Sequence, residues 1–177
     1  VWSEERLIAA VEATGRFFAL PYGPSGVAPS DDIHAYESYF ERLEQAGLRD
    51  IKRPDLLIFS ASKRPDILNA VQMLGGAQML PFTPEDRLGA ILREAILAVE
   101  CENSLWKARQ MPDYQAPLKP QRRLNGKLGL KKNAVLPTVI VKAEDRERLR
   151  DWQASHAIPI HIWQAFYDLA YGISLER

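Results

Sequence analysis

An apolar run at residues 95–107, AILAVECENSLWK, ends in two glutamates that flank the only cysteine of the chain. In a strand, side chains alternate between the two faces, so Glu100 and Glu102 would share one face while Cys101 packs on the other. In a helix that continues from the preceding segment, the two acids would point apart. The dense apolar content and the polar boundary at Asn103 favour a strand. The run therefore predicts a buried strand that carries two carboxylates on one face near its end.

Short apolar runs alternate with helical stripes along the rest of the chain. Apolar residues at helical spacing predict helices at 3–20, 31–48, 65–76, 83–95 and 144–157. Branched apolar runs without such a stripe predict strands at 55–60, 96–103, 136–142 and 157–166. Strands that alternate with helices indicate an α/β (α+β) domain, and we expect a central mixed β-sheet flanked by helices.

The composition fits one domain and gives no guide to a partner. A length of 177 residues with 46% hydrophobic and 26% charged residues predicts a single domain over 1–177, with N-terminal helices at 1–50 and a core at 51–177. Because Lys plus Arg equals Asp plus Glu, a nucleic-acid surface would require uneven charge distribution. The sequence shows no secretory signal, no apolar run of about 18 residues and no cysteine pair, so we expect a cytoplasmic protein.

A third acid, Asp55, follows Pro54 at the start of another predicted buried strand. If this strand neighbours 96–103, Asp55 joins Glu100 and Glu102 at the strand ends. Three carboxylates within about 4 Å repel by several kcal/mol at an effective dielectric of about 20, so they need a cation or must take up protons. Oxygen ligands that leave room for water suit Mg²⁺ better than Zn²⁺. Such a site is suited to phosphodiester hydrolysis, because a divalent ion neutralises phosphate charge and acidifies water.

The segments PDLLIF and VECENS together resemble the signature of the PD-(D/E)XK nucleases, in which an acid at the start of one strand meets an acid-x-lysine pair on another. Pro54–Asp55 matches the first half and Glu100 matches the second acid. Glu102 stands where the family usually has lysine, as in a Glu-x-Glu version found among type II restriction endonucleases. The two halves are 100 − 55 = 45 residues apart, so a helix must be inserted between them. The ending, from PTVIVK to AYGI, resembles restriction enzymes of the AccI type.

This resemblance implies a restriction-endonuclease-like fold and a Mg²⁺-dependent endodeoxyribonuclease. The implied protein is a type II restriction enzyme of a restriction-modification system, which cuts double-stranded DNA at a specific sequence. A homodimer is expected, since a symmetric protein most simply reads a palindromic site. The resemblance assigns catalysis to Asp55, Glu100 and Glu102, with Asp55 and Glu100 as metal ligands. Glu102 would either bind metal or orient the attacking water.

Two further roles in the family have several candidates here. An additional acid often comes from the helix before the first catalytic strand, where Glu37, Glu41 and Glu44 lie. We select Glu41 as a metal ligand because it lies near the middle of that helix, although a solvated helix face is the simpler reading. Lys107, which follows the acids, is a candidate for a displaced lysine.

A basic segment, KPQRRLNGKLGLKKN at 119–133, contains no acid. Both residues of its Asn125–Gly126 pair tolerate positive φ, which predicts a hairpin turn. A basic two-stranded ribbon fits the major groove of DNA, while an exposed basic loop without a ligand is the alternative. Lys142 either contacts phosphate near the acids or lies in solvent. The predicted DNA-binding residues are Lys119, Arg122, Arg123, Asn125, Lys127, Lys131 and Lys132.

Two other functions fit the same sequence. One is a non-specific or structure-specific nuclease of the same family, acting in repair or as a resolvase. The other is a non-catalytic nucleic-acid-binding α/β module whose acids are surface charges. The three histidines lack zinc-ligand spacing, and the glycines form neither a Walker loop nor a dinucleotide-binding fingerprint.

Overall fold

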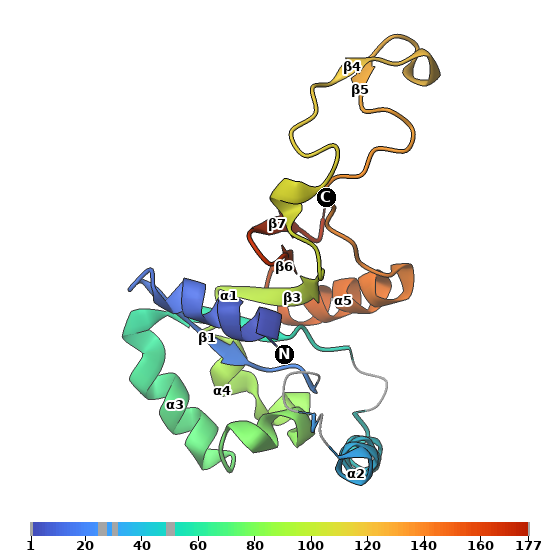
Figure 1. Ribbon diagram of the computed structural model, residues 1–177. Coiled ribbons are helices and arrows are strands. Elements are labelled where there is room, and N and C mark those ends of the chain that lie inside the picture. Colours follow the sequence, from blue (N-terminus) through green and yellow to red (C-terminus); the bar gives the residue numbers. More distant parts are fainter. Residues whose placement is uncertain (1, 25–27, 30–31, 49–51, 177) are drawn as a thin grey trace.

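A five-stranded mixed β-sheet forms the centre of the computed structural model, which describes residues 2–24, 28–29, 32–48 and 52–176 (Figure 1). In their order across the sheet, the strands are β1 (Phe17–Pro21), β2 (Leu56–Ser60), β3 (Leu97–Asn103), β6 (Ile160–Ala165) and β7 (Ala170–Ser174). Neighbouring strands are antiparallel except for β3 and β6, which run parallel. The crossover between these two parallel strands contains the last helix of the chain.

Helices lie on both sides of this sheet, so the prediction of a mixed sheet flanked by helices is confirmed. They are α1 (Trp2–Glu12), α2 (Ile33–Gln45), α3 (Arg64–Met73), α4 (Gly89–Leu92) and α5 (Ala143–His156). Short 3₁₀ turns at 61–63, 77–82, 85–87, 108–110 and 122–124 connect them. No helix in the described part of the chain is long and apolar enough to cross a membrane.

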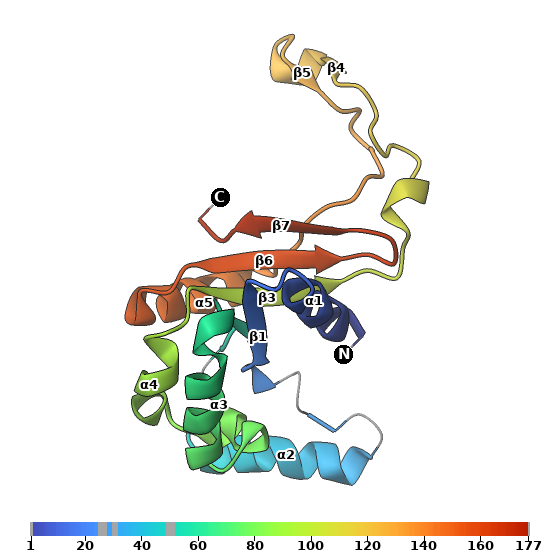
Figure 2. The same ribbon diagram turned by 90° about the vertical axis from the view of Figure 1, so that its left-hand side faces the viewer.

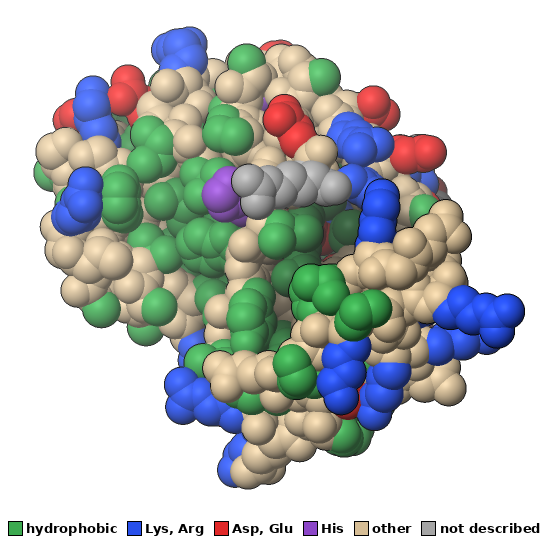
Figure 3. All heavy atoms as spheres, turned by 90° about the horizontal axis from the view of Figure 1, so that it is seen from above, with side chains coloured by type: hydrophobic (Ala, Val, Ile, Leu, Met, Phe, Trp, Pro, Cys, Tyr) green, Lys and Arg blue, Asp and Glu red, His purple; other side chains and the backbone are tan. Residues whose placement is uncertain are grey.

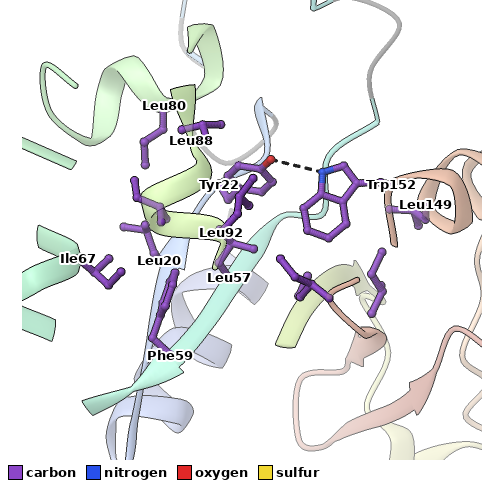
Figure 4. Close-up of a cluster of buried hydrophobic side chains, with 14 of the residues drawn as sticks. Leu20, Tyr22, Leu57, Phe59, Ile67, Leu80, Leu88, Leu92, Leu149 and Trp152 are labelled. Carbon is purple, nitrogen blue, oxygen red and sulfur yellow. Dashed lines mark hydrogen bonds between the residues drawn. The ribbon is translucent and has the colours of Figure 1, made fainter. Parts of the chain in front are cut away.

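The two faces of the sheet bury alternate residues of each strand. On one face, side chains of β2 and β3 pack against Leu7 and Val11 of α1. The other face contributes to a larger core with α3, α4 and α5, part of which is shown in Figure 4. In this core the Trp152 indole N–H donates to the Tyr22 hydroxyl at 3.4 Å. Both faces of β3 are therefore covered, except near its carboxyl end, where its burial decreases.

The run at 95–107 forms a strand, and the alternative of one long helix is wrong. The helix α4 ends at Leu92, and the Ile96 N–H donates to the Ile58 carbonyl at 2.9 Å as the chain enters the sheet. Glu100 lies opposite Ile162 of β6, and Glu102 lies opposite Gln164. The predicted sharing of one face by the two glutamates is thus confirmed by the strand register.

Three predicted elements differ from the structure. The helix at 3–20 ends at Glu12, because Gly15 turns the chain with a φ of +67° and the next residues form β1. The helix at 83–95 is only α4 and a 3₁₀ turn, because the Thr83 hydroxyl donates to the Met79 carbonyl instead of capping a new helix. The strand at 136–142 is absent from both sheets in the described residues, and its Ile140 N–H donates to the Gln164 side chain.

Between β3 and α5 the chain leaves the sheet as a long excursion, residues 104–142, which we call the arm (Figures 1 and 2). Near its tip, β4 (Lys119–Pro120) pairs antiparallel with β5 (Leu128–Gly129). Asn125 and Gly126 adopt φ values of +52° and +82°, so the predicted turn is present. A 3₁₀ turn lengthens the loop, and the ribbon is shorter than a typical hairpin. The predicted division of the single domain into N-terminal helices and a core, at residues 50 and 51, falls outside the described residues.

Candidate active site

Asp55 and Glu100 meet where the ladder between β2 and β3 ends. The last pair of that ladder is Leu56 with Val99, so the two acids occupy the next position. The Asp55 carboxylate accepts the backbone N–H of Cys101 at 2.7 Å and thereby continues the hydrogen bonding of the sheet. Both acids are buried, with exposed fractions of 5% for Asp55 and 3% for Glu100.

The two carboxylate oxygens of Glu100 have different surroundings. Its Oε1 lies 2.5 Å from the Lys52 ammonium, whereas its buried Oε2 has no hydrogen-bond partner. Burial and the charge of Asp55 raise the pKa of Glu100 to about 8, against the opposing effect of Lys52. A buried carboxylate with an unsatisfied oxygen is costly, so this atom is placed to accept a proton or to bind a cation.

Lys52 is a site residue that the sequence analysis did not identify. Burial lowers its pKa, but the charge and hydrogen bond of Glu100, with Asp55 and Asp145, raise the pKa above its ordinary value overall. Lys52 is therefore a charged ammonium group within the acidic cluster. Its position three residues before Asp55, in the sequence KRPD, is the one local signal that could have identified it.

Arg53 fixes the segment that carries Lys52 and Asp55. It is 3% exposed and donates from Nε to Glu85 at 2.6 Å. Its other guanidinium nitrogens donate to the backbone carbonyl oxygens of residues 80, 81 and 83 at 2.9, 3.2 and 2.6 Å. Such a fully bonded buried arginine holds the backbone in place on both sides of itself.

Gly23 permits the chain after β1 to pass close to Asp55. Its N–H donates to the Asp55 carbonyl at 3.1 Å. A Cβ at this position would lie 2.9 Å from the Pro54 carbonyl oxygen and 3.0 Å from the Cα of Asp55. The absence of a side chain at Gly23 is therefore a requirement of the site geometry.

Glu102 and Cys101 lie on opposite faces of β3, as predicted. Cys101 packs with the α1 side of the core, and burial together with the charge of Asp55 raises the pKa of its thiol. Glu102 is half-buried, and burial and Asp55 raise the pKa of its carboxyl, while Lys52 and Lys142 oppose this. The exposed Lys142 thus lies close enough to act electrostatically on Glu102.

The helical acid beside this cluster is Glu4 of α1. It is buried, and burial followed by the charge of Asp55 raises its pKa to about 6. The structure does not bring the predicted Glu41 to this position. Glu41 is exposed on α2, in a groove with Tyr36 and Phe40, and Figures 1 and 2 both show α2 well away from β3. The reason is that α1, not α2, packs on the sheet face next to β3.

The remaining predicted residues lie on the arm. Lys107 is exposed and precedes the 3₁₀ turn at 108–110, so the structure does not place it with the acids. Lys131 forms an ion pair with Asp113 at 2.8 Å, which links the two sides of the arm. The predicted DNA-binding residues are all exposed: Lys119, Arg122, Arg123, Asn125, Lys127, Lys131 and Lys132.

The acidic cluster fits Mg²⁺ through two carboxylates. Within the described ranges, no three His, Cys, Asp or Glu side chains are grouped to hold a metal ion. Mg²⁺ is usually bound by one or two protein carboxylates, with water and substrate phosphate completing its shell. Asp55 and Glu100 provide such a pair, and the unpartnered Oε2 of Glu100 is a free donor atom for a cation.

The chain was compared with family models, curated proteins and solved structures, and none of them matches it. The assignment of function therefore depends on the fold and on the side chains of the site.

Proposed function

We propose that this protein is a Mg²⁺-dependent endodeoxyribonuclease that hydrolyses phosphodiester bonds of double-stranded DNA. The observation that carries the proposal is the buried pair of Asp55 and Glu100, with Lys52 on one oxygen of Glu100 and no partner on the other. A surface cluster of acids would be solvated and would show no such raised pKa. Two acids buried away from water, one of them ion-paired with a lysine, are instead typical of a catalytic centre.

The position of these residues on the sheet supports a restriction-endonuclease-like fold. Asp55 immediately precedes β2, and Glu100 and Glu102 lie near the end of the adjacent β3, which is the arrangement of the PD-(D/E)XK signature. Glu4 of α1 lies near Asp55, and PD-(D/E)XK nucleases often have a further acid that comes from a helix. A sequence-specific type II restriction enzyme is the form of this activity that we favour.

Different residues of the site would have different roles in hydrolysis. Asp55 and Glu100 would hold Mg²⁺, which when bound supplies positive charge for the phosphate and acidifies water. Lys52 supplies the cation that the motif lysine would otherwise provide, and it can stabilise negative charge that develops on the phosphate. Glu102 is half-exposed with a raised pKa, so it can accept a proton from an attacking water.

The arm is the proposed DNA-binding element. Its first residue follows β3 directly after the acids, and its last residue, Lys142, acts electrostatically on Glu102. DNA bound along the arm would therefore pass the acidic cluster. Figure 3 views the molecule from the end that carries the arm, and Lys and Arg side chains project from the surface there. Lysines would bind phosphates, while arginines could also pair with guanine.

Long duplex DNA incubated with the protein and Mg²⁺ tests this function. A sequence-specific enzyme gives discrete bands, and a non-specific or structure-specific nuclease gives a smear or selective cutting. DNA that stays intact under these conditions, and yet is bound, would contradict the proposal and favour a non-catalytic binding module. If the cut sites are palindromic, we expect light scattering to show a dimer on DNA.

The role of the arm has a separate test. Replacing Arg122 and Arg123 with alanine should weaken DNA binding and flatten its salt dependence, because two phosphate or base contacts are lost. The matched control replaces two exposed arginines outside the arm, Arg87 and Arg93. Equal DNA affinities for the two double variants would show that the arm is not part of the DNA interface.

A further inference from the structure

A small pocket lies at the root of the arm, next to the acidic cluster. Its volume is about 320 Å³, and Glu102 forms part of its wall. This volume is at the lower end of the range of about 300–1,000 Å³ for small-molecule sites, so it admits one ring system and not a duplex. Because Glu102 belongs to both the pocket and the acidic cluster, an occupant of the pocket would lie beside that cluster.

The pocket has both apolar and polar lining residues. Met111, Ile140 and Phe166 line it with apolar surface, and Ser104 and Thr138 add hydroxyl groups. Its residues come from the end of β3, from both sides of the arm and from the end of β6. The arm therefore frames the pocket, and DNA held by the arm would lie across its mouth.

Gln164 is the buried polar side chain that faces this pocket. It is 4% exposed and lies opposite Glu102 in the register of β3 and β6. Its Oε1 accepts the Ile140 N–H at 3.3 Å, which orients the amide. Among the described residues, Glu100 Oε2 is the fully buried side-chain polar atom without a partner, so the N–H₂ group of Gln164 is not sealed in the core. Because Gln164 lines the pocket, this group can act there as a donor to a ligand.

We propose that the pocket binds one nucleobase, displaced from the duplex stack, of a nucleotide that flanks the bond to be cut. This inference rests on the proposed nuclease function. An extrahelical base is commonly held between apolar or aromatic side chains and read at its edge by hydrogen bonds. Met111 and Phe166 offer the apolar surfaces, and Gln164 offers an amide, which can pair with adenine in the same way as it does in a groove.

Fluorescence of 2-aminopurine, which increases when the base leaves the stack, tests this proposal. Cut sites are first mapped with the wild-type protein and Mg²⁺. Duplexes then carry 2-aminopurine at one or the other nucleotide flanking the mapped bond, or far from it as a control, and are bound by the non-cutting Glu100→Gln variant. We expect a several-fold rise at one flanking position and none at the distant position.

Two further substitutions, each added to Glu100→Gln, separate the pocket from general binding. Gln164→Leu removes the amide, and Met111→Trp fills the pocket with a larger side chain, so each should abolish the rise while DNA affinity is retained. If wild-type protein cuts DNA but no flanking base brightens, the inference is wrong and the nuclease function stands. A rise that persists in both variants also overturns it. If the wild-type protein cuts no DNA, the proposed function fails, and the inference fails with it.

Discussion

Replacing Glu100 with glutamine should stabilise the protein at pH 8 in the absence of divalent metal. Glu100 is 3% exposed, adjoins Asp55, and has one oxygen without a partner. Glutamine has nearly the same shape and keeps an oxygen that can accept from Lys52, but it carries no charge. The substitution therefore removes an electrostatic cost from the folded state while it removes a proposed metal ligand.

The magnitude follows from the pKa of Glu100, which rises from 4.5 to about 8 on folding. Between these values the folded protein retains a proton that the unfolded chain has released, so stability falls as pH rises from 4.5 to 8. At 1.36 kcal/mol per pKa unit, the loss is on the order of 5 kcal/mol. The pKa of about 8 already includes the favourable effect of Lys52 on the charged form of Glu100. We therefore expect a gain on the order of 5 kcal/mol at pH 8, and no gain at pH 4.5.

Urea unfolding followed by tryptophan fluorescence, with EDTA present, measures this difference at both pH values. Glu102→Gln is the matched control, because Glu102 is half-exposed and its charge costs less in the folded state. Addition of Mg²⁺ should stabilise the wild type and leave the Glu100→Gln variant nearly unchanged. A Glu100→Gln variant that is no more stable than the wild type at pH 8 would refute the argument that the ionised Glu100 carboxylate destabilises the folded protein when no cation is bound.

Three further variants test single contacts. Lys52→Met should slow DNA cutting by about tenfold or more without weakening DNA binding. Its control is Lys63→Met, which breaks an exposed ion pair and should not change the cutting rate. Equal cutting rates for the two variants would exclude Lys52 from catalysis. Gly23→Ala should displace Asp55 and lower the cutting rate at saturating DNA, and an unchanged rate would contradict the close approach described above. Arg53→Met should lower the free energy of unfolding by about 3–5 kcal/mol in urea, and a loss below about 1 kcal/mol would refute its anchoring role.

Strand periodicity was sufficient to predict the acids on β3. Alternation placed Glu100 and Glu102 on one face and Cys101 on the other, and the register of the sheet confirms this. The start of β2 was predicted to within one residue, because Asp55 was taken as the first residue of that strand and lies immediately before it. These predictions succeeded because both strands are buried on both faces and are bounded by polar or proline residues, which gives a strong local signal.

Contacts between segments that lie far apart in the sequence could not be predicted from local sequence patterns. Lys52 meets Glu100, and Glu4 lies near Asp55, only because β2, β3 and α1 pack together. The helix predicted at 3–20 concealed β1, since FFALP fits a helical stripe as well as a strand until Gly15 turns the chain. The same limit explains the choice of Glu41, because sequence order alone does not tell which helix lies beside the strand.

The most direct test of the central claim is a cleavage assay with wild-type protein and the Glu100→Ala variant on the same long duplex DNA. DNA binding is measured on the same samples. The buried cluster predicts that the wild type cuts with Mg²⁺ and does not cut with EDTA, and that the variant binds DNA with similar affinity but does not cut. Cutting by Glu100→Ala at the wild-type rate would contradict the assignment of the site.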